Sequence, residues 1–319
     1  MTLDHPVLSA LLPVVLLIAI GVVAGKARLL RGESVRDLSN LVFLVLTQAL
    51  LFRTMSAVHI ERLDFKSVAL YYAVAGGLFV VLLLVQGLSS RSAVLALAAI
   101  FSNTLMIGVP LVSLAYGEAG LVQLFTLISM HALVLLTFAT VVLELLAAHE
   151  DARAGRAEPR HLLLTVGRAV KNAVIHPVPL PIIAGLLYAQ TGWGLHPVVD
   201  RPLKLLGDAF GPVALLLVGV TLAQAAIGAQ LKGALLISAI KTLLHPALMA
   251  AAGWLAGLRG LPLAVMVVAA SLPVGANVFL FSQRYRKAED LVTASVAVST
   301  VLALFSVSLV MALLPKLPG

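Results

Sequence analysis

The sequence predicts an all-α integral membrane protein in which ten transmembrane helices form two halves of five. Three observations support this fold class. The 319-residue chain is 61% hydrophobic with a mean hydropathy of +1.07, and 11% of its residues are charged, whereas a soluble domain carries about 25%. The apolar residues fall into runs of about 20, the length that crosses about 30 Å of hydrocarbon. One run in each half is interrupted by Pro, Gly and Asn.

The predicted spans are separated by short polar loops, with one longer polar connection between the fifth and the sixth. This connection divides the chain into a first repeat (1–148), a short linker (149–172) and a second repeat (173–319). Because each half holds an odd number of spans, the second half is inverted relative to the first. The predicted spans cover residues 6–26, 37–56, 67–87, 93–116, 120–147, 173–191, 206–227, 233–255, 261–283 and 291–314.

The loop charges predict the orientation. If the N-terminus lies outside, the inner loops contain about twice as many Lys and Arg residues as the outer segments, as the positive-inside rule requires. Both termini are therefore predicted outside and the linker in the cytoplasm. The net charge of +8 lies in these loops, so anionic membrane lipids are the expected partner rather than nucleic acid. The chain has no cysteine, which excludes disulfides and thiolate metal sites.

The two interrupted spans are the strongest functional signal. The first reads S-N-T-L-M-I-G-V-P from Ser102 to Pro110, and the second reads A-S-L-P-V-G-A-N from Ala270 to Asn277. A broken membrane helix frees backbone N–H and C=O groups, which is tolerated only where protein or a water-filled cavity covers the break. Each interrupted span is the fourth of its half, and such matched interruptions indicate a transporter binding site near the bilayer midplane.

In the first interruption, Asn103 is the candidate for substrate binding. Its amide offers two donors and an acceptor, and nearby half-helix N-termini favour negative charge, so it could hold a carboxylate. The alternative is that Asn103 only satisfies the broken backbone. Gly108 and Pro110 are expected to shape the break rather than to touch the substrate.

In the second interruption, Pro273 is expected to break the helix because proline cannot donate the helical hydrogen bond. Gly275, which permits close approach to the backbone, is placed with the substrate-binding residues. Asn277 either faces the substrate or caps a half-helix.

Ionisable and polar residues inside other spans are further candidates. Lys241 is the only Lys or Arg well inside a span, a costly position that usually has a function or a partner. It could balance an anionic substrate or change protonation during transport, with His245 on the same helix face. Alternatively, it tethers backbone carbonyls at a helix break near Pro246. His131 is either a coupling residue or a packing residue.

The second span carries Gln48, with Asn40 and Thr47 on the same helix. Gln48 is a candidate for substrate binding if this helix lines the cavity. The alternative is that these side chains hold neighbouring helices together by hydrogen bonds.

Acidic residues are absent from the span midpoints, and Glu144 and Asp208, which come closest, lie near span ends. Sodium–proton exchange through buried carboxylates is therefore disfavoured. The spans contain no H-E-x-x-H or G-x-S-x-G motif and no paired Asp, so an enzyme is not expected. No metal site and no cofactor is predicted.

The two interruptions, with Ala115-Tyr116-Gly117 after the first and Tyr285 after the second, resemble the auxin efflux carrier family, which includes bacterial carriers and plant auxin exporters. The resemblance implies two inverted five-helix repeats, in a fold related to that of bile-acid/sodium symporters. It also implies that the interrupted helices 4 and 9 cross, and that both repeats contribute to a scaffold domain and a transport domain.

The expected function is that of a secondary active transporter of small organic anions, either carboxylates or auxin-like acids. It would work by alternating access at the crossing of helices 4 and 9, in a bacterial cytoplasmic (inner) membrane. A channel or a receptor-like protein that senses such anions is the alternative. H⁺ and Na⁺ both stay open as coupling ions, and a homodimer is suggested by the resemblance alone.

Overall fold

The computed structural model describes residues 6–30, 32–153, 163–164, 167, 171, 178–225 and 228–314. Most of the predicted linker, and residues 173–177 at the start of the predicted sixth span, lie outside the described residues. Within the described part of the chain the regular elements are helical, apart from one isolated antiparallel β-bridge between Ser102 and Val274. The chain therefore has an all-α fold, as predicted.

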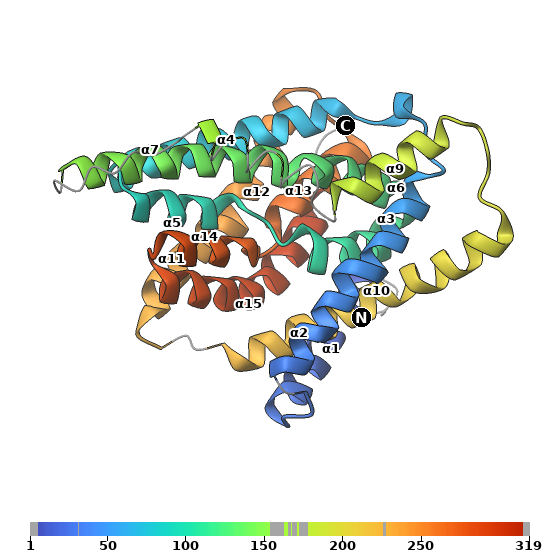
Figure 1. Cartoon of the computed structure of the whole chain (residues 1–319), viewed down its shortest axis with the longest axis horizontal. Helices are drawn as coiled ribbons and strands as arrows, with labels where there is room; N and C mark the ends of the chain where they lie inside the picture. The colour runs from blue at the N-terminus through green and yellow to red at the C-terminus, as the bar shows by residue number, and fades with distance from the viewer. Residues whose placement is uncertain are drawn as a thin grey trace.

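Figure 1 shows the helices in their order along the chain. In the labels used below, η1, η3, η4 and η6 are π-helical turns and η2 and η5 are 3₁₀ turns. The bounds are α1 Pro6–Lys26, α2 Gly32–Leu41, η1 Val42–Leu46, α3 Thr47–Met55, η2 Ile60–Arg62, α4 Phe65–Gln86, α5 Ser90–Ile100, η3 Thr104–Gly108, α6 Val109–His131, η4 Ala132–Leu136, α7 Thr137–Arg153, α9 Pro179–Ala189, α10 Pro197–Gln224, η5 Gly228–Gln230, α11 Leu231–Ala239, η6 Ile240–Leu244, α12 His245–Leu255, α13 Gly260–Ser271, α14 Asn277–Tyr285 and α15 Glu289–Leu313.

Six helical segments of the described chain are long and apolar enough to span a membrane: Glu33–Met55, Phe65–Gln86, Thr104–Arg153, Pro197–Gln224, Leu231–Leu255 and Glu289–Leu313. Four shorter apolar helices accompany them: Leu11–Lys26, Ser90–Ile100, Pro179–Ala189 and Gly260–Ser271. The longest segment is bent at Gly117, whose φ of 61° and ψ of −154° interrupt the helix. The sequence predicts a boundary between two spans at this point.

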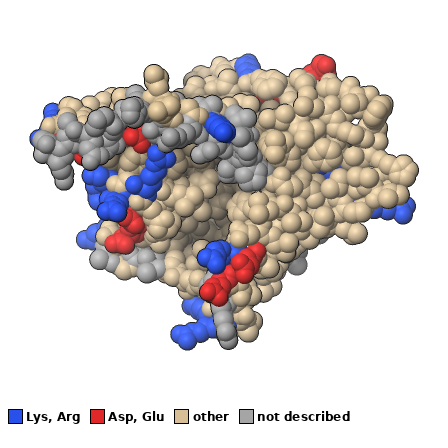
Figure 2. All heavy atoms as spheres, viewed as in Figure 1, with Lys and Arg blue, Asp and Glu red and all other residues tan. Residues whose placement is uncertain are grey.

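The outer surface of the helices is apolar. Large hydrophobic side chains are exposed along α4, α9 and α15, for example Val85 (79%), Leu187 (63%) and Phe305 (72%). Figure 2 shows a face whose right half is largely uncharged, with most charged side chains on the left half and in the lower centre. A water-soluble monomer rarely exposes apolar patches of this extent. This surface is consistent with lipid contact and with the predicted membrane fold.

The helices pack in two groups (Figure 1). The first group contains α1, the continuous run α2–η1–α3, α9 and α10. The second contains α4, α5, α7 and α11 to α15, and α6 contacts both groups. In the first group, α1 packs closely along α10 because Gly21 faces Gly219. Small residues allow helix backbones to approach closely in a membrane.

Two short helices of the second group, α5 and α13, bring the chain to the functional site. They contain 11 and 12 residues, which corresponds to about 16–18 Å, or half the hydrocarbon thickness. Ser89 caps the start of α5 by accepting a hydrogen bond from the Ser92 N–H. Most side chains of both helices are buried. Both helices therefore end in the protein interior, where their freed backbone groups need partners.

Candidate functional site

The first interruption follows α5. Phe101 leaves the helix with an extended backbone (φ −83°, ψ 113°), and η3 begins at Thr104. Asn103 caps η3, because its Oδ1 accepts a hydrogen bond from the Met106 N–H at 3.2 Å. The side-chain carbonyl thus satisfies one N–H that the break has freed. The amide nitrogen of Asn103 still has two hydrogens to donate.

The second interruption follows α13. Leu272 is extended (φ −63°, ψ 156°), as expected for a residue that precedes proline, and Pro273 has no N–H to continue the helix. The next N–H, that of Val274, donates to the Ser299 hydroxyl of α15 at 3.0 Å. The helix α14 then begins at Asn277. Proline and the residue before it therefore explain why α13 ends here.

The two interruptions pair with each other through their backbones. The Asn103 N–H donates to the Pro273 carbonyl at 2.9 Å, and the Gly275 N–H donates to the Phe101 carbonyl at 2.9 Å. These bonds flank the antiparallel bridge between Ser102 and Val274. Each break thus supplies a hydrogen-bond donor and an acceptor to the other. These bonds satisfy backbone groups that lipid could not satisfy.

Gly275 makes this close approach sterically feasible. A Cβ atom at Gly275 would lie 2.7 Å from Phe101 Cδ1 and 3.0 Å from the Ser102 carbonyl oxygen. On the other side of the crossing, a Cβ at Gly108 would lie 2.7 Å from Leu272 Cδ1. The two glycines therefore set the distance between the interrupted segments.

A cavity of about 320 Å³ lies at this crossing. Its lining is mostly apolar, with a few polar groups from Asn and His side chains, as is typical of small-molecule sites. The lining residues are Asn40, Phe43 and Leu44 from the second predicted span, 101–106 and 275–277 from the two interruptions, and Ile128, His131 and Val178.

Some of the residues predicted to bind the substrate line the cavity, and others lie outside it. Asn103, Gly275, Asn277 and His131 line the cavity. The amide of Gln48 donates to the Phe43 carbonyl at 3.1 Å, and Gln48 is not among the lining residues, although Asn40 of the same span is.

The predicted helix-breaking residues lie close to the crossing. Pro273 lies within the second break. Gly108 is the last residue of the π-helical turn η3. Pro110 is the second residue of α6, which continues from η3 with helical backbone dihedrals at Val109. The first break itself lies upstream of both residues, at 101–103.

Lys241 lies behind the crossing and is fully buried. Its Nζ donates to the Ala270 carbonyl at 2.5 Å. This carbonyl belongs to the last turn of α13, where C=O groups lack helical partners and the helix dipole favours a positive charge. The lysine therefore tethers η6 to the end of α13, whereas the tether considered from sequence was placed near Pro246.

Aromatic rings connect the lysine region to the cavity. The Tyr71 ring lies 5.9 Å from the His131 ring and 5.8 Å from the His245 ring, measured between centroids. The Tyr71 hydroxyl is 3.2 Å from the Ser102 hydroxyl in the first interruption. His131 also packs against Phe101, with ring centroids 4.5 Å apart. Tyr71, which sequence reasoning did not single out, thus stands between the two histidines.

A sequence model of the family described as membrane transport protein matches residues 6–311 of the chain. The chain belongs to the auxin efflux carrier family of membrane transport proteins. The resemblance stated from the interrupted motifs is therefore confirmed, and the coarse functional class is that of a membrane transporter.

Three curated proteins with similar sequences are described by their names, identities and coverage. The chain is 27% identical over 285 residues to a protein of Rhizobium meliloti named "Putative malonate transporter", covering 87% of this chain and 86% of the relative. It is 23% identical to auxin efflux carrier component 8 of Arabidopsis thaliana, covering 64% of this chain and 66% of the relative. It is 26% identical to an uncharacterized transporter of Methanothermobacter thermautotrophicus, covering 67% and 66%.

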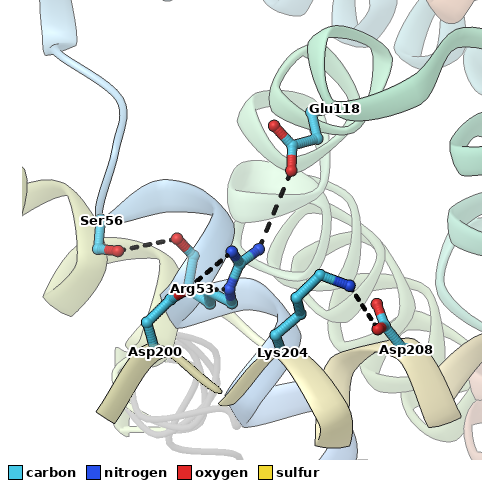
Figure 3. A network of polar contacts seen from close by, with 6 residues as sticks. All are labelled: Arg53, Ser56, Glu118, Asp200, Lys204 and Asp208. Carbon is cyan, nitrogen blue, oxygen red and sulfur yellow. Dashed lines mark hydrogen bonds and ion pairs between the residues drawn. The ribbon is translucent and has the colours of Figure 1, made fainter. Parts of the chain in front are cut away.

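Charged side chains of this transporter pair at the ends of the helices. In Figure 3, Arg53 of α3 points towards Asp200 of α10, with Nε 2.7 Å from Oδ1 and a second nitrogen, NH2, 3.3 Å from Oδ2. The same guanidinium lies 3.9 Å from the Glu118 carboxylate of α6. Lys204 and Asp208 pair within α10 at 2.6 Å. The network joins helices that are far apart in sequence.

A second set of polar contacts joins α7 to α14 and its end. Glu144 accepts hydrogen bonds from the Tyr285 hydroxyl at 2.9 Å and from Arg284 at 3.4 Å. Glu150 accepts from the Ser90 N–H at 2.6 Å and pairs with Lys287 at 3.1 Å. Glu144, one of the two acidic residues nearest the predicted span midpoints, thus has its partners at the end of α14 and not in the cavity.

Replacing Asp200 with asparagine is expected to lower the stability of the protein by about 1 kcal/mol, because a two-point, charge-assisted contact with partly buried Arg53 is lost. Replacing Glu118, whose side chain is 88% exposed at 3.9 Å from Arg53, with glutamine is the control and is expected to cause no measurable change. Thermal unfolding of both variants in detergent is the measurement. Equal losses of stability would contradict this assignment.

Proposed function

We propose that this protein is a secondary active transporter of small organic anions, and that it binds a carboxylate in the crossover cavity. The observation that carries the proposal is the cavity itself, which lies where two interrupted helices pair through their backbones and is lined by both. Interrupted helices in membrane transporters place half-helix ends at the substrate. Membership of a transporter family supports the same class of function.

The polar groups of the cavity suit a carboxylate. The Asn103 amide nitrogen is available because its Oδ1 accepts the Met106 N–H. Asn277 lies at the first turn of α14, where the helix dipole favours negative charge. Among the described residues its side chain has no hydrogen-bond partner. The side-chain amides of Asn103 and Asn277 and the N-terminus of α14 thus lie at the same cavity.

The size of the cavity favours a small acid. At about 320 Å³ it lies at the low end of the range of ligand pockets, roughly 300–1,000 Å³. The rhizobial relative, which aligns with most of this chain, carries malonate in its name. A short mono- or dicarboxylate is therefore the proposed substrate class, with malonate as the first compound to test.

Transport proceeds by alternating access in this proposal. The ten helical spans form two inverted five-helix repeats, and both termini lie outside a bacterial inner membrane. The helices α1 to α3, α9 and α10 act as a scaffold. The second packing group, which carries the crossing, moves against it. In this motion the contact between Arg53 and Glu118, which joins α3 to α6, is made and broken.

The test is counterflow of radiolabelled malonate into proteoliposomes, with competition by a panel of monocarboxylates, dicarboxylates and indole-3-acetate. Counterflow needs neither an ion gradient nor net charge movement, so it reports on electrogenic and electroneutral carriers alike. Saturable exchange that a subset of acids inhibits supports the proposal. Absence of exchange for every acid in the panel overturns it.

Replacing Asn277 with alanine is expected to weaken malonate binding by about tenfold, because a hydrogen bond to a charged group contributes about 1.5 kcal/mol. The measurement is the concentration dependence of counterflow at equal incorporation. Replacement of the exposed Gln190 with alanine removes an amide far from the cavity and serves as the control. An unchanged apparent affinity in the Asn277→Ala variant would remove Asn277 from the site.

A further inference from the structure

His131 is a buried wall residue of the crossover cavity and lacks a polar partner. It is 4% exposed and lines the cavity. Within the described part of the chain, neither of its ring nitrogens has a hydrogen-bond partner. A neutral imidazole has one donor and one acceptor nitrogen, and leaving such groups unpaired in a protein interior is costly. A carboxylate in the cavity would provide the missing acceptor.

A second unpartnered histidine and the buried lysine lie behind His131. His245 is fully buried, and both its ring nitrogens are unpaired among the described residues. It follows Lys241 by four residues, and the Tyr71 ring bridges it to His131. The described partner of Lys241 is a backbone carbonyl and not a carboxylate. The described residues around the crossing thus include basic groups without a matching negative charge.

Among the described residues, none of those packed around His131 has a carboxylate that could supply this charge. The titratable groups that face it are Tyr71 and Tyr72 from α4, at 5.9 and 6.2 Å between ring centroids, and, behind Tyr71, Lys241 and His245. The helix α13 and the turns η3 and η4 have no ionisable side chain. Of the other charged groups of the neighbouring helices, Glu118 lies beside the bend at Gly117, and Glu144 lies in the middle of α7, where it bonds to Arg284 and Tyr285 of α14. The remaining ones lie in first or last turns: Lys66, Arg91, Glu150, Asp151, Arg153, Lys232, Glu289 and Asp290.

We infer that His131 takes up one proton when an organic anion occupies the crossover cavity, so that the transporter carries anion and proton together. This inference rests on the proposed function and names its coupling ion. Without the anion, an imidazolium at this position would be a buried charge with no compensation, close to other basic groups, which is strongly unfavourable. A carboxylate in the cavity supplies the opposite charge and favours the protonated ring.

The proton follows the anion through the cycle. It binds a ring nitrogen of His131 from the water that enters the cavity on one side of the membrane. It leaves when the anion departs on the other side, because the protonated ring then loses its counter-charge. The hydrogen bond between Tyr71 and Ser102 ties the Tyr71 ring, which packs on His131, to the interrupted segment. Binding in the cavity and protonation of His131 are thus coupled through one rigid contact.

Two transport measurements in proteoliposomes test the proton inference and the proposed function separately. Counterflow of radiolabelled malonate at equal pH on both sides tests transport alone. With the membrane potential clamped at zero, an imposed outside-acid gradient is then expected to drive about tenfold malonate accumulation for each pH unit, since one coupled proton supplies that free energy. Counterflow without gradient-driven accumulation overturns the proton inference only. Absence of counterflow overturns the proposed function and this inference with it.

The variant His131→Gln tests the residue. Glutamine can still donate a hydrogen bond in the cavity but cannot take up a proton, so accumulation in the pH gradient, measured relative to the variant's own counterflow, is expected to be lost. His59→Gln, in an exposed turn, is the matched control and is expected to retain both activities. Gradient-driven accumulation in the His131→Gln variant would overturn the assignment to His131.

Proton uptake can also be measured on the unaltered protein, which tests the inference even if the His131→Gln variant does not fold. Calorimetric titration with malonate in two buffers of different ionisation enthalpy counts the protons taken up on binding. One proton per bound malonate, at a pH where the free acid is fully ionised, is the expected result. Binding of malonate without proton uptake would contradict the inference directly.

Discussion

Replacing Gly275 with valine is expected to abolish transport, because the side chain would force the two interrupted segments apart. The first added carbon alone would lie 2.7 Å from the Phe101 ring and 3.0 Å from the Ser102 carbonyl. The ring can turn, but the carbonyl belongs to the backbone that pairs with Gly275. The bond from the Gly275 N–H to the Phe101 carbonyl, 2.9 Å long, would be lost first. Such overpacking typically costs about 1–3 kcal/mol.

The effect on function is expected to exceed the effect on stability. The same backbone bonds that Gly275 allows also fix the positions of Asn103 and Asn277 at the cavity, so a small separation changes the binding geometry. Malonate counterflow in proteoliposomes is expected to fall at least tenfold at equal incorporation, as misplacement of about 1 Å can cause in other active sites. Elution as a single species in size-exclusion chromatography would show that the fold is retained.

Gly194 provides the matched control for this variant. Like Gly275 it lies outside the helices and has no positive φ, but a Cβ at Gly194 meets no atom within 4 Å. Gly194→Val is therefore expected to transport like the unaltered protein. Normal counterflow in the Gly275→Val variant would mean that the close backbone crossing is not needed for transport.

The positions of the two interruptions could be predicted from the sequence because they depend on local chemistry. Proline removes a helical N–H and extends the residue before it, so Leu272 and Pro273 end α13 wherever the surrounding fold places them. The first break depends less on proline. Asn103 marks it and lies at the end of the extended residues 101–103, whereas Pro110 lies downstream, inside the helix that follows. The π-helical turn η3 fills the space between them.

The contacts around the cavity could not be predicted, because they join residues that are distant in the sequence. Tyr71 lies in α4 and looks like an ordinary aromatic residue of a membrane span; only the packing of α4 against α6 and α12 places it between His131 and His245. The hydrogen-bond acceptor of Lys241 could not be predicted from the sequence either, because it is the backbone carbonyl of Ala270. Such an acceptor exists wherever a helix ends, and the sequence carries no sign of which end is near.

The close packing of α1 on α10 also depends on distant residues, and it leads to the second prediction with a large expected effect. Replacing Gly219 with valine is expected to destabilise the protein by about 3 kcal/mol or more. A Cβ at Gly219 would overlap the Ile18 carbonyl oxygen and lie 2.8 Å from the Gly21 Cα. Both atoms belong to the backbone of α1, so no side-chain rotation can relieve the overlap, and the two helices must separate.

Gly76→Val is the control that separates crowding from helix propensity. Gly76 also lies within a long helix, α4, but a Cβ there meets no atom within 4 Å. Both variants carry the same cost of a β-branched residue in a helix, whereas only Gly219→Val opens the contact with α1. Thermal unfolding in detergent is therefore expected to show a decrease in Tm of roughly 5–10 °C for Gly219→Val and little change for Gly76→Val. Equal decreases would mean that the glycine pair of α1 and α10 does not hold the first packing group together. In that case the scaffold against which the crossing moves would have to be stabilised by other contacts, such as the pair between Arg53 and Asp200.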